Sequence, residues 1–176
     1  MKRIAPTLAL ALIPAALALM VATVSVPGPG LAAERVAQFE KWEVVTFDED
    51  GTTGCYIMAR PDKEEGNYTE RGPVAAFVTH RPAAGEIGVV SVAAGYAYDP
   101  ASTPRIEIGS ASFNLFAQGE NAWANDEDDP KIVAAMKAGN NMIVVGVSEH
   151  GTETRDTYSL IGFTRATQAA AEACGL

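Results

Sequence analysis

The sequence is poor in the side chains that most enzymes and metal sites use. It has only two cysteines and two histidines among 176 residues. It contains no Cys-x-x-Cys pair, no Gly-x-Ser-x-Gly elbow and no phosphate-binding glycine loop. These absences argue against thiol redox chemistry, a zinc centre, a hydrolase nucleophile and a nucleotide pocket. We therefore predict no catalytic residues, no cofactor and no metal.

The few titratable candidates do not form a recognisable catalytic pattern. His80 and His150 are interpreted as surface turn histidines, and a triad drawn from Ser148 or Ser159 with Asp156 has no support in the spacing. Asp48 and Asp50 fail the calcium-loop pattern and are expected in a solvated turn. The acidic run at residues 126–129, close to Trp123, leaves open a carbohydrate-acting hydrolase that uses paired carboxylates.

Positive charge is also scarce. All 22 acidic residues follow position 33, whereas two of the 13 basic residues precede it, so residues 34–176 carry a net charge of −11. Such a protein repels nucleic-acid backbones and anionic lipid and favours a cationic ligand or a basic surface. The alternative interpretation is that the acidity only keeps an exported protein soluble. We expect no nucleic-acid partner.

The only long apolar run lies at the N-terminus and reads as an export signal. Lys2 and Arg3 precede an almost unbroken apolar stretch at residues 4–26, and Pro27 to Gly30 break it before small residues at 31–33. This is the pattern of a cleaved signal peptide over residues 1–33, with cleavage after Ala32 or Ala33. An uncleaved anchor is the alternative, because the run approaches the length of a membrane span. We expect a periplasmic, secreted or outer-surface bacterial protein that touches the membrane only through the signal segment before cleavage.

In an oxidising compartment two lone cysteines are expected to pair. A bond between Cys55 and Cys174 would tie the C-terminal segment to an early hairpin and enclose nearly the whole domain. In the chain-entropy model a closed loop of roughly 100 residues contributes about 4.7 kcal/mol of stability. We therefore predict a disulfide-closed domain that spans residues 34–176.

The remainder of the chain reads mainly as short strands separated by turns, which favours an all-β sandwich. The expected strands are residues 42–47, 54–59, 74–80, 88–93, 105–108, 112–118, 141–148 and 152–160, with a polar loop at 60–72. Tyr96 and Tyr98 alternate with small residues, so they either form an exposed face or pack as ordinary edge-strand aromatics.

Two helices interrupt the strands. One short internal helix is expected after Asp129 as N-cap, with Pro130 in its first turn and Gly139 ending it in the left-handed region. The second covers residues 164–174. One face of this helix forms a packing stripe that consists of Phe163, Ala166, Ala170, Ala173 and Cys174.

Several stretches resemble the invasion-associated locus B family of exported bacterial proteins. They are residues 42–44, 55–56, 77–82, 106–115 and 122–123 and, most specifically, 151–163 with the helix that follows. The resemblance implies an immunoglobulin-like β-sandwich in the periplasm or at the outer surface, with no established catalytic residues and, in one pathogenic lineage, a role in entry into host red cells. Many members carry an additional cysteine pair that this chain lacks.

Two classes of function follow. The first is a non-enzymatic envelope protein that binds an envelope or host protein through sheet edges or loops, for example the loop at residues 99–104. The alternative is a periplasmic hydrolase that acts on carbohydrate, or a carrier of small ligands, which would need a buried apolar pocket between the sheets.

Overall fold

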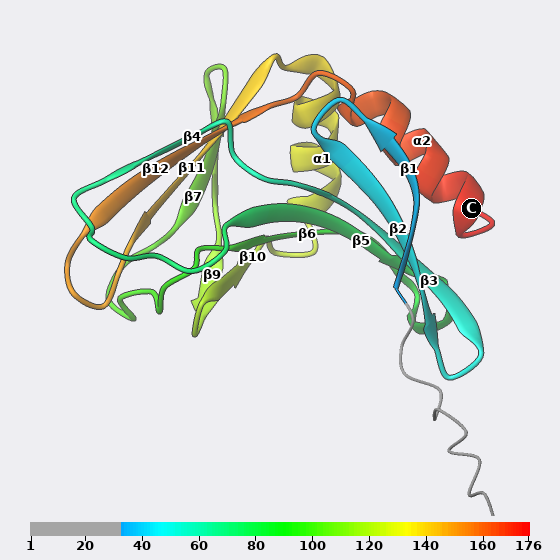
Figure 1. Ribbon diagram of the computed structural model, residues 1–176, viewed down its shortest axis with the longest axis horizontal. Coiled ribbons are helices and arrows are strands. Elements are labelled where there is room, and N and C mark those ends of the chain that lie inside the picture. The colour runs from blue at the N-terminus through cyan, green and yellow to red at the C-terminus, as the bar shows by residue number, and fades with distance from the viewer. Residues whose placement is uncertain (1–32) are drawn as a thin grey trace, which may run out of the picture. The chain divides into compact units, whose positions relative to one another are not determined.

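The computed structural model describes residues 33–176, which belong to one compact unit. The expected signal segment lies outside the described residues apart from Ala33. The described chain forms a mostly β, sandwich-like fold with two antiparallel sheets, one internal helix and one C-terminal helix (Figure 1). The predicted fold class is thereby confirmed. Between residues 33 and 176 no helix is long and apolar enough to cross a bilayer.

The larger sheet has seven strands in the order β1-β2-β3-β5-β6-β10-β9. Their bounds are β1 Glu34–Phe39, β2 Trp42–Glu49, β3 Thr52–Ala59, β5 Ala75–Arg81, β6 Glu86–Ala93, β10 Asn121–Trp123 and β9 Phe116–Gln118. A two-residue turn joins β2 to β3, and both its residues, Asp50 and Gly51, have positive φ. An Asp-Gly pair is the sequence that such a hairpin turn favours, so the turn sets the register of the β2–β3 pair.

The smaller sheet has five strands in the order β4-β12-β11-β7-β8. Their bounds are β4 Lys63–Gly66, β12 Glu153–Ser159, β11 Asn141–Val147, β7 Arg105–Ile108 and β8 Ala111–Asn114. Its central strand β11 is strongly apolar, as a strand paired on both sides and buried should be. An isolated bridge from Tyr98 to Ser148 also ties the chain between β6 and β7 to the end of β11.

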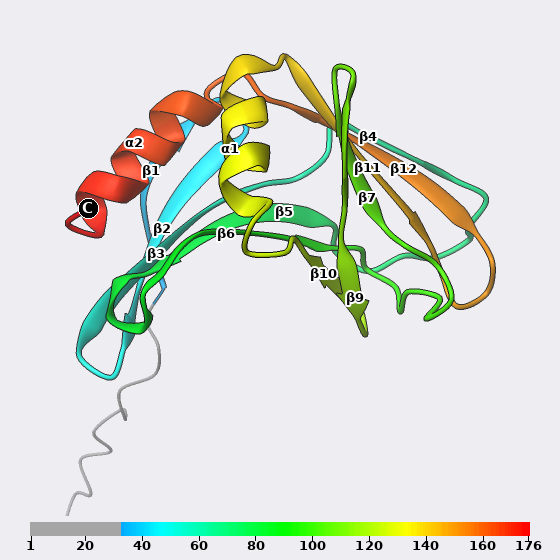
Figure 2. The same cartoon turned by 180° about the vertical axis from the view of Figure 1, so that it is seen from behind.

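Both helices lie on the same side of the seven-stranded sheet, as the two opposite views show (Figures 1 and 2). Helix α2, Phe163–Ala173, contacts β1, β2 and β3, and helix α1, Asp129–Ala138, contacts β6. The α2 stripe is confirmed for Phe163, Ala166 and Ala170, which are fully buried, whereas Ala173 is exposed. No helix lies on the other side of β2, β3 and β5 in residues 33–176.

One hydrophobic core joins both sheets and both helices. Its largest fully buried side chains are Trp42, Tyr158, Phe163, Ile57, Ile106, Ile132, Met136 and Met142. The Trp42 and Phe163 rings meet edge to face with centroids 4.9 Å apart, and the Trp42 indole N–H donates to the Ser159 carbonyl at 3.0 Å. These contacts join β2, α2 and the end of β12, and they fix the position of the C-terminal helix against the sheet.

Several predicted boundaries were wrong. Strands β1, β4 and β10 were not predicted, and β4 lies within the expected polar loop at residues 60–72. The expected strand at 112–118 is two strands, β8 and β9, which belong to different sheets. They are separated at Leu115, whose side chain is buried and whose amide bonds the Pro104 carbonyl, so the chain crosses between sheets at an anchored residue. Strong β propensity on both sides of Leu115 concealed this crossing.

The predicted ends of α1 also differ. Asp129 is not the N-cap. It is the first helical residue, buried, and its carboxylate accepts a hydrogen bond from the Val90 amide at 2.8 Å. Gly139 is extended rather than left-handed, with φ −87° and ψ 166°. A Cβ at this position would lie 2.7 Å from Ile108 Cγ2, so close packing rather than backbone conformation calls for glycine.

Candidate functional site

The disulfide joins Cys55 on β3 to Cys174 at the end of α2, with the two Cα atoms 5.9 Å apart. Cys55 lies on the inner side of β3 with Ile57 and Ala59, all of them buried. Because side chains alternate along a strand, the neighbouring residues Tyr56 and Met58 point to the opposite, outer side. The predicted bond is therefore present, and it fastens α2 to the inner face of the seven-stranded sheet.

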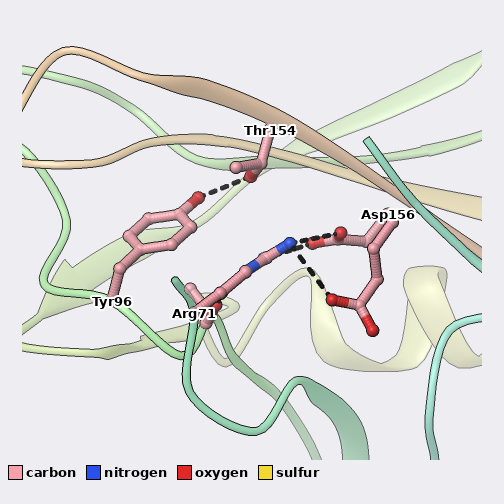
Figure 3. Close-up of polar contacts among 6 residues, drawn as sticks. Arg71, Tyr96, Thr154 and Asp156 are labelled. Carbon is pink, nitrogen blue, oxygen red and sulfur yellow. Dashed lines mark hydrogen bonds and ion pairs between the residues drawn. The ribbon is translucent and has the colours of Figure 1, made fainter. Parts of the chain in front are cut away.

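A second anchor is a buried ion pair between the chain before β5 and the five-stranded sheet. The Arg71 guanidinium donates to both carboxylate oxygens of Asp156 on β12, at 2.7 and 2.6 Å, and its Nε donates to the Ala94 carbonyl (Figure 3). Both side chains are 3% exposed. Burial lowers the pKa of Arg71, but the hydrogen bonds and charge of Asp156 outweigh it and the net pKa is raised.

Aromatic rings enclose this ion pair. The Arg71 guanidinium carbon lies 5.4 Å from the centre of the Tyr68 ring and 5.0 Å from that of Tyr96. The Tyr96 hydroxyl bonds the Thr154 hydroxyl at 2.6 Å, as Figure 3 shows. Tyr96 also packs edge to face with buried Tyr98. Of the two interpretations of this tyrosine pair, the structure supports packing rather than an exposed face.

The Arg71–Asp156 pair is a structural feature rather than a binding site. All the donors used by the guanidinium are directed at protein acceptors, and the pair is inaccessible to a ligand. Sequence reasoning missed it. A lone arginine in a polar loop gives no signal of burial, and Asp156 was considered only as a triad member.

The two histidines lie in different environments. His150 is exposed beside Glu149, as predicted. His80 is buried, which corrects the surface interpretation: it lies in β5 opposite Cys55, and its Nδ1 accepts a hydrogen bond from the Gly88 amide at 3.1 Å. Burial and then the charge of Lys137 lower the pKa of His80. Within residues 33–176 no three His, Cys, Asp or Glu side chains are grouped as a metal site.

The outer side of the seven-stranded sheet carries a row of aromatic side chains. The cross-strand register places Tyr56 opposite Val45 and Thr79, and Phe77 opposite Met58 and Ser91. Ring centres of Phe47 and Tyr56 are 6.0 Å apart, as are those of Tyr56 and Phe77. These rings line an open depression with a volume of about 390 Å³, here called the aromatic groove. Glu49, Arg81 and Asn121 are among its polar lining residues.

A second open depression adjoins the aromatic groove and shares Arg81 with it. It has a volume of about 590 Å³ and is lined by Glu86, Trp123, Asp126 and Asp129, among others. We call it the acidic depression. The structure therefore brings together the carboxylates and Trp123 that the hydrolase hypothesis requires. One of them, Asp129, already accepts the Val90 amide, and burial followed by the charges of Asp126 and Asp128 raises its pKa.

The other sequence-derived sites are less open. The loop at 99–104 is a compact turn in which Asp99 Oδ1 accepts the Ala101 amide and the Asp99 carbonyl accepts the Ser102 hydroxyl. Asp48 Oδ1 accepts the Gly51 amide, so this carboxylate supports the β2–β3 turn. The carrier hypothesis requires a buried apolar pocket between the sheets, whereas the aromatic groove is an open depression on the outer side of one sheet.

Comparison with known proteins agrees with the fold. Residues 42–171 match the family model described as "Invasion associated locus B (IalB) protein". A crystal structure of invasion associated protein B from Bartonella henselae is similar, with a TM-score of 0.56 and 18% identity over 80% of this chain and 95% of that chain. No protein of curated function matches. The family is not a known enzyme family. Since the match spans most of the chain, including the Cys55 strand and nearly all of α2, this protein belongs to the invasion associated locus B family.

Proposed function

We propose that this chain is an exported, non-enzymatic cell-envelope protein that acts by binding another protein, in the envelope or on a host cell. The proposal joins three elements: the N-terminal export pattern of the sequence, the family, and the uncovered outer side of the seven-stranded sheet. The last of these is the observation that carries it.

The outer sheet face has the properties of a binding surface. Its strands are held rigidly from the inner side by α2, the disulfide and the Trp42–Phe163 contact. On the outer side, Phe47, Tyr56 and Phe77 line an open groove that no helix covers in the described part of the chain. Partly exposed aromatic side chains on a rigid support are the usual anchors of protein interfaces, because they bury much area and lose little conformational entropy.

The arrangement of titratable groups also favours binding over catalysis. His80 is buried with Nδ1 occupied, and His150 lies apart in an exposed turn. General acid–base catalysis needs such groups within hydrogen-bond reach of one another or of a substrate. Asp129, whose pKa burial raises, holds β6 to α1 instead.

In-cell photo-crosslinking tests the proposal. A benzophenone amino acid replaces Ser91, which lines the aromatic groove, and in a matched strain it replaces exposed Gln168 on α2, on the opposite side of the sheet. We expect the Ser91 position to give a discrete crosslinked protein that the Gln168 position does not give. Absence of any crosslinked protein from either position, in bacteria alone and in contact with host cells, would count against an interaction function.

A further inference from the structure

We propose that the aromatic groove together with the acidic depression binds a cationic segment of the partner protein, that is, a short stretch rich in arginine or lysine. This inference rests on the proposed function and assigns its partner chemistry. Its evidence comes from the position of the rings, the balance of charge around them and a cation–π contact within the protein.

The first observation is the position of the Phe47 ring. A Cβ built on Gly54, the residue directly opposite in β3, would collide with the Phe47 ring. The far end of the ring therefore lies over the glycine, in the space that any larger side chain at position 54 would fill. A ring face carries the negative end of the aromatic quadrupole, which attracts a cation.

The protein itself already places a cation near this ring. The Arg81 guanidinium carbon lies 5.9 Å from the Phe47 ring centre, within the range of cation–π attraction. Arg81 is also paired with Glu49 at 3.5 Å and with Glu86 at 3.1 Å, and its side chain is 42% exposed. Such a partly exposed ion pair is weak, so an incoming arginine or lysine can share or exchange these carboxylates at little cost.

The third observation is an excess of negative charge around the site. Arg81 faces two carboxylates of its own, Glu49 and Glu86, so one negative charge remains. Asp126 and Asp129 line the adjoining depression, and neither has an ion-pair partner among residues 33–176. The whole of residues 34–176 carries a charge of −11, so the local field and the long-range field both favour a basic partner.

The same charges disfavour the other occupants. If a second copy of the chain docked face to face, the acidic residues around the two grooves would lie close together. Both molecules also carry a negative net charge, so electrostatic repulsion opposes this association. The apolar N-terminal segment is not the occupant of the groove in the exported protein, because the sequence predicts that it is cleaved off after Ala32 or Ala33. Ala33 lines the groove, so the test requires protein that the cell has processed.

The test is an NMR titration of isotopically labelled protein purified from the periplasm. The probe is a short peptide of alternating arginine and alanine, compared with a glutamate–alanine peptide of equal length and with the oligosaccharide cellotetraose. We expect the arginine peptide to shift the resonances of outward residues on β2, β3 and β5, with a Kd on the order of 100 µM, because the contact area is small. Binding should weaken as salt is raised.

Two kinds of variant locate the site. Tyr56→Ser and Phe77→Ser remove rings and should each weaken binding about tenfold. The double variant Glu49→Gln/Glu86→Gln should weaken binding about tenfold as well and flatten its salt dependence. Its matched control, Glu149→Gln/Glu172→Gln, loses the same charge at exposed positions elsewhere and should stay within about twofold of the wild type. The charge variants alter only exposed groups, so they decide the question even if a ring variant fails to fold.

Three results would overturn the inference: shifts centred outside the outer sheet face, equal weakening by the two charge variants, or preferential binding of the glutamate peptide. Preferential binding of cellotetraose would reassign the groove to carbohydrate. These failures differ from failure of the proposed function. A partner crosslinked from Ser91 whose capture is unchanged by Glu49→Gln/Glu86→Gln leaves the interaction function standing and removes only its cationic chemistry.

Discussion

Arg71 is a guanidinium held inside the protein by acceptors from two parts of the chain, Ala94 and Asp156. Its position depends on a close approach of two glycines. The Gly72 amide donates to the Gly95 carbonyl at 2.8 Å, and a Cβ on Gly95 would collide with the Gly72 backbone. Because Gly72 and Gly95 have no side chains, their backbones come into contact, and this places Arg71 next to the loop that contains Tyr96. At this scale, one buried charge holds the end of the polar segment after β3, whose earlier part is held by the pairing of β4 with β12.

Removing this arginine should therefore be costly. Arg71→Met leaves the Asp156 carboxylate buried without a partner, and we expect it to lower the free energy of unfolding by about 3–5 kcal/mol. Arg71→Met/Asp156→Leu should recover much of that loss, because no uncompensated charge remains. Arg81→Met, which breaks partly exposed pairs, should cost less than about 1 kcal/mol. Urea unfolding of the three proteins measures all of these values, and equal losses in the first two would contradict the explanation.

His80 makes stability depend on pH. Its pKa in the folded protein lies below the ordinary value of about 6.5, owing to burial and then to Lys137. As the pH falls below about 6.5 the unfolded chain takes up the proton first, so the free energy of unfolding falls with it. We expect His80→Asn, whose side-chain oxygen can still accept the Gly88 amide, to reduce this slope between about pH 5 and 7. His150→Asn should retain the wild-type slope in the same urea titrations.

At the scale of elements, the seven-stranded sheet has two unlike sides. The inner side is covered by α1 and α2 and carries the disulfide, whereas the outer side carries the aromatic groove. The alternation of side chains along β3 produces this division directly, since Cys55 and Tyr56 are adjacent in sequence and point to opposite sides. Fastening α2 on one side therefore stiffens the strands that present the groove on the other.

Opening the disulfide tests this coupling. We expect Cys55→Ser/Cys174→Ser to lower the free energy of unfolding by about 2–5 kcal/mol, the usual range for a native disulfide. The loss of protection in hydrogen exchange should concentrate in α2 and in the β2–β3 hairpin, and β11 and β12 should change little. Reduced wild-type protein provides the matched comparison. Uniform loss of protection, or none in α2, would show that the bond does not act through this helix.

At the scale of the whole molecule, the predicted signal segment ends where the described fold begins. Residues 34–176 carry a charge of −11, and the first strand, β1, begins at Glu34, directly after the expected cleavage positions. Cleavage after Ala32 or Ala33 would thus leave the folded domain complete.

Cell fractionation with N-terminal sequencing checks this expectation. We expect the native protein in the periplasm or at the cell surface, with Ala33 or Glu34 as its first residue, because the small residues before Glu34 fit a signal peptidase. A chain that begins at Met1 and fractionates with the membrane would instead establish the uncleaved anchor. In that case the leader would remain attached at Ala33, beside the aromatic groove.

The all-β architecture, both helices and the Cys55–Cys174 bond follow from local features of the sequence. Strands such as β7 and β11 have dense β-branched residues between strong turn signals, the Asp50-Gly51 turn has its own backbone preference, and the stripe on α2 has helical spacing. Two cysteines permit a single intramolecular pairing. These properties depend on neighbours in the chain, so the chain alone reveals them.

The candidate site was not predictable in the same way. Phe47, Tyr56 and Phe77 all lie in expected strands, but a strand pattern does not tell which side of a sheet another element covers. Likewise, tertiary packing alone places Arg71 against Asp156 and makes His80 a buried residue. It also gives the Asp129 carboxylate the Val90 amide as its partner, in place of the expected helix-cap role. Local sequence determined the elements and the covalent bond. Tertiary structure alone decided which sheet face stays open and which charges are buried, since both depend on residues far apart in the chain.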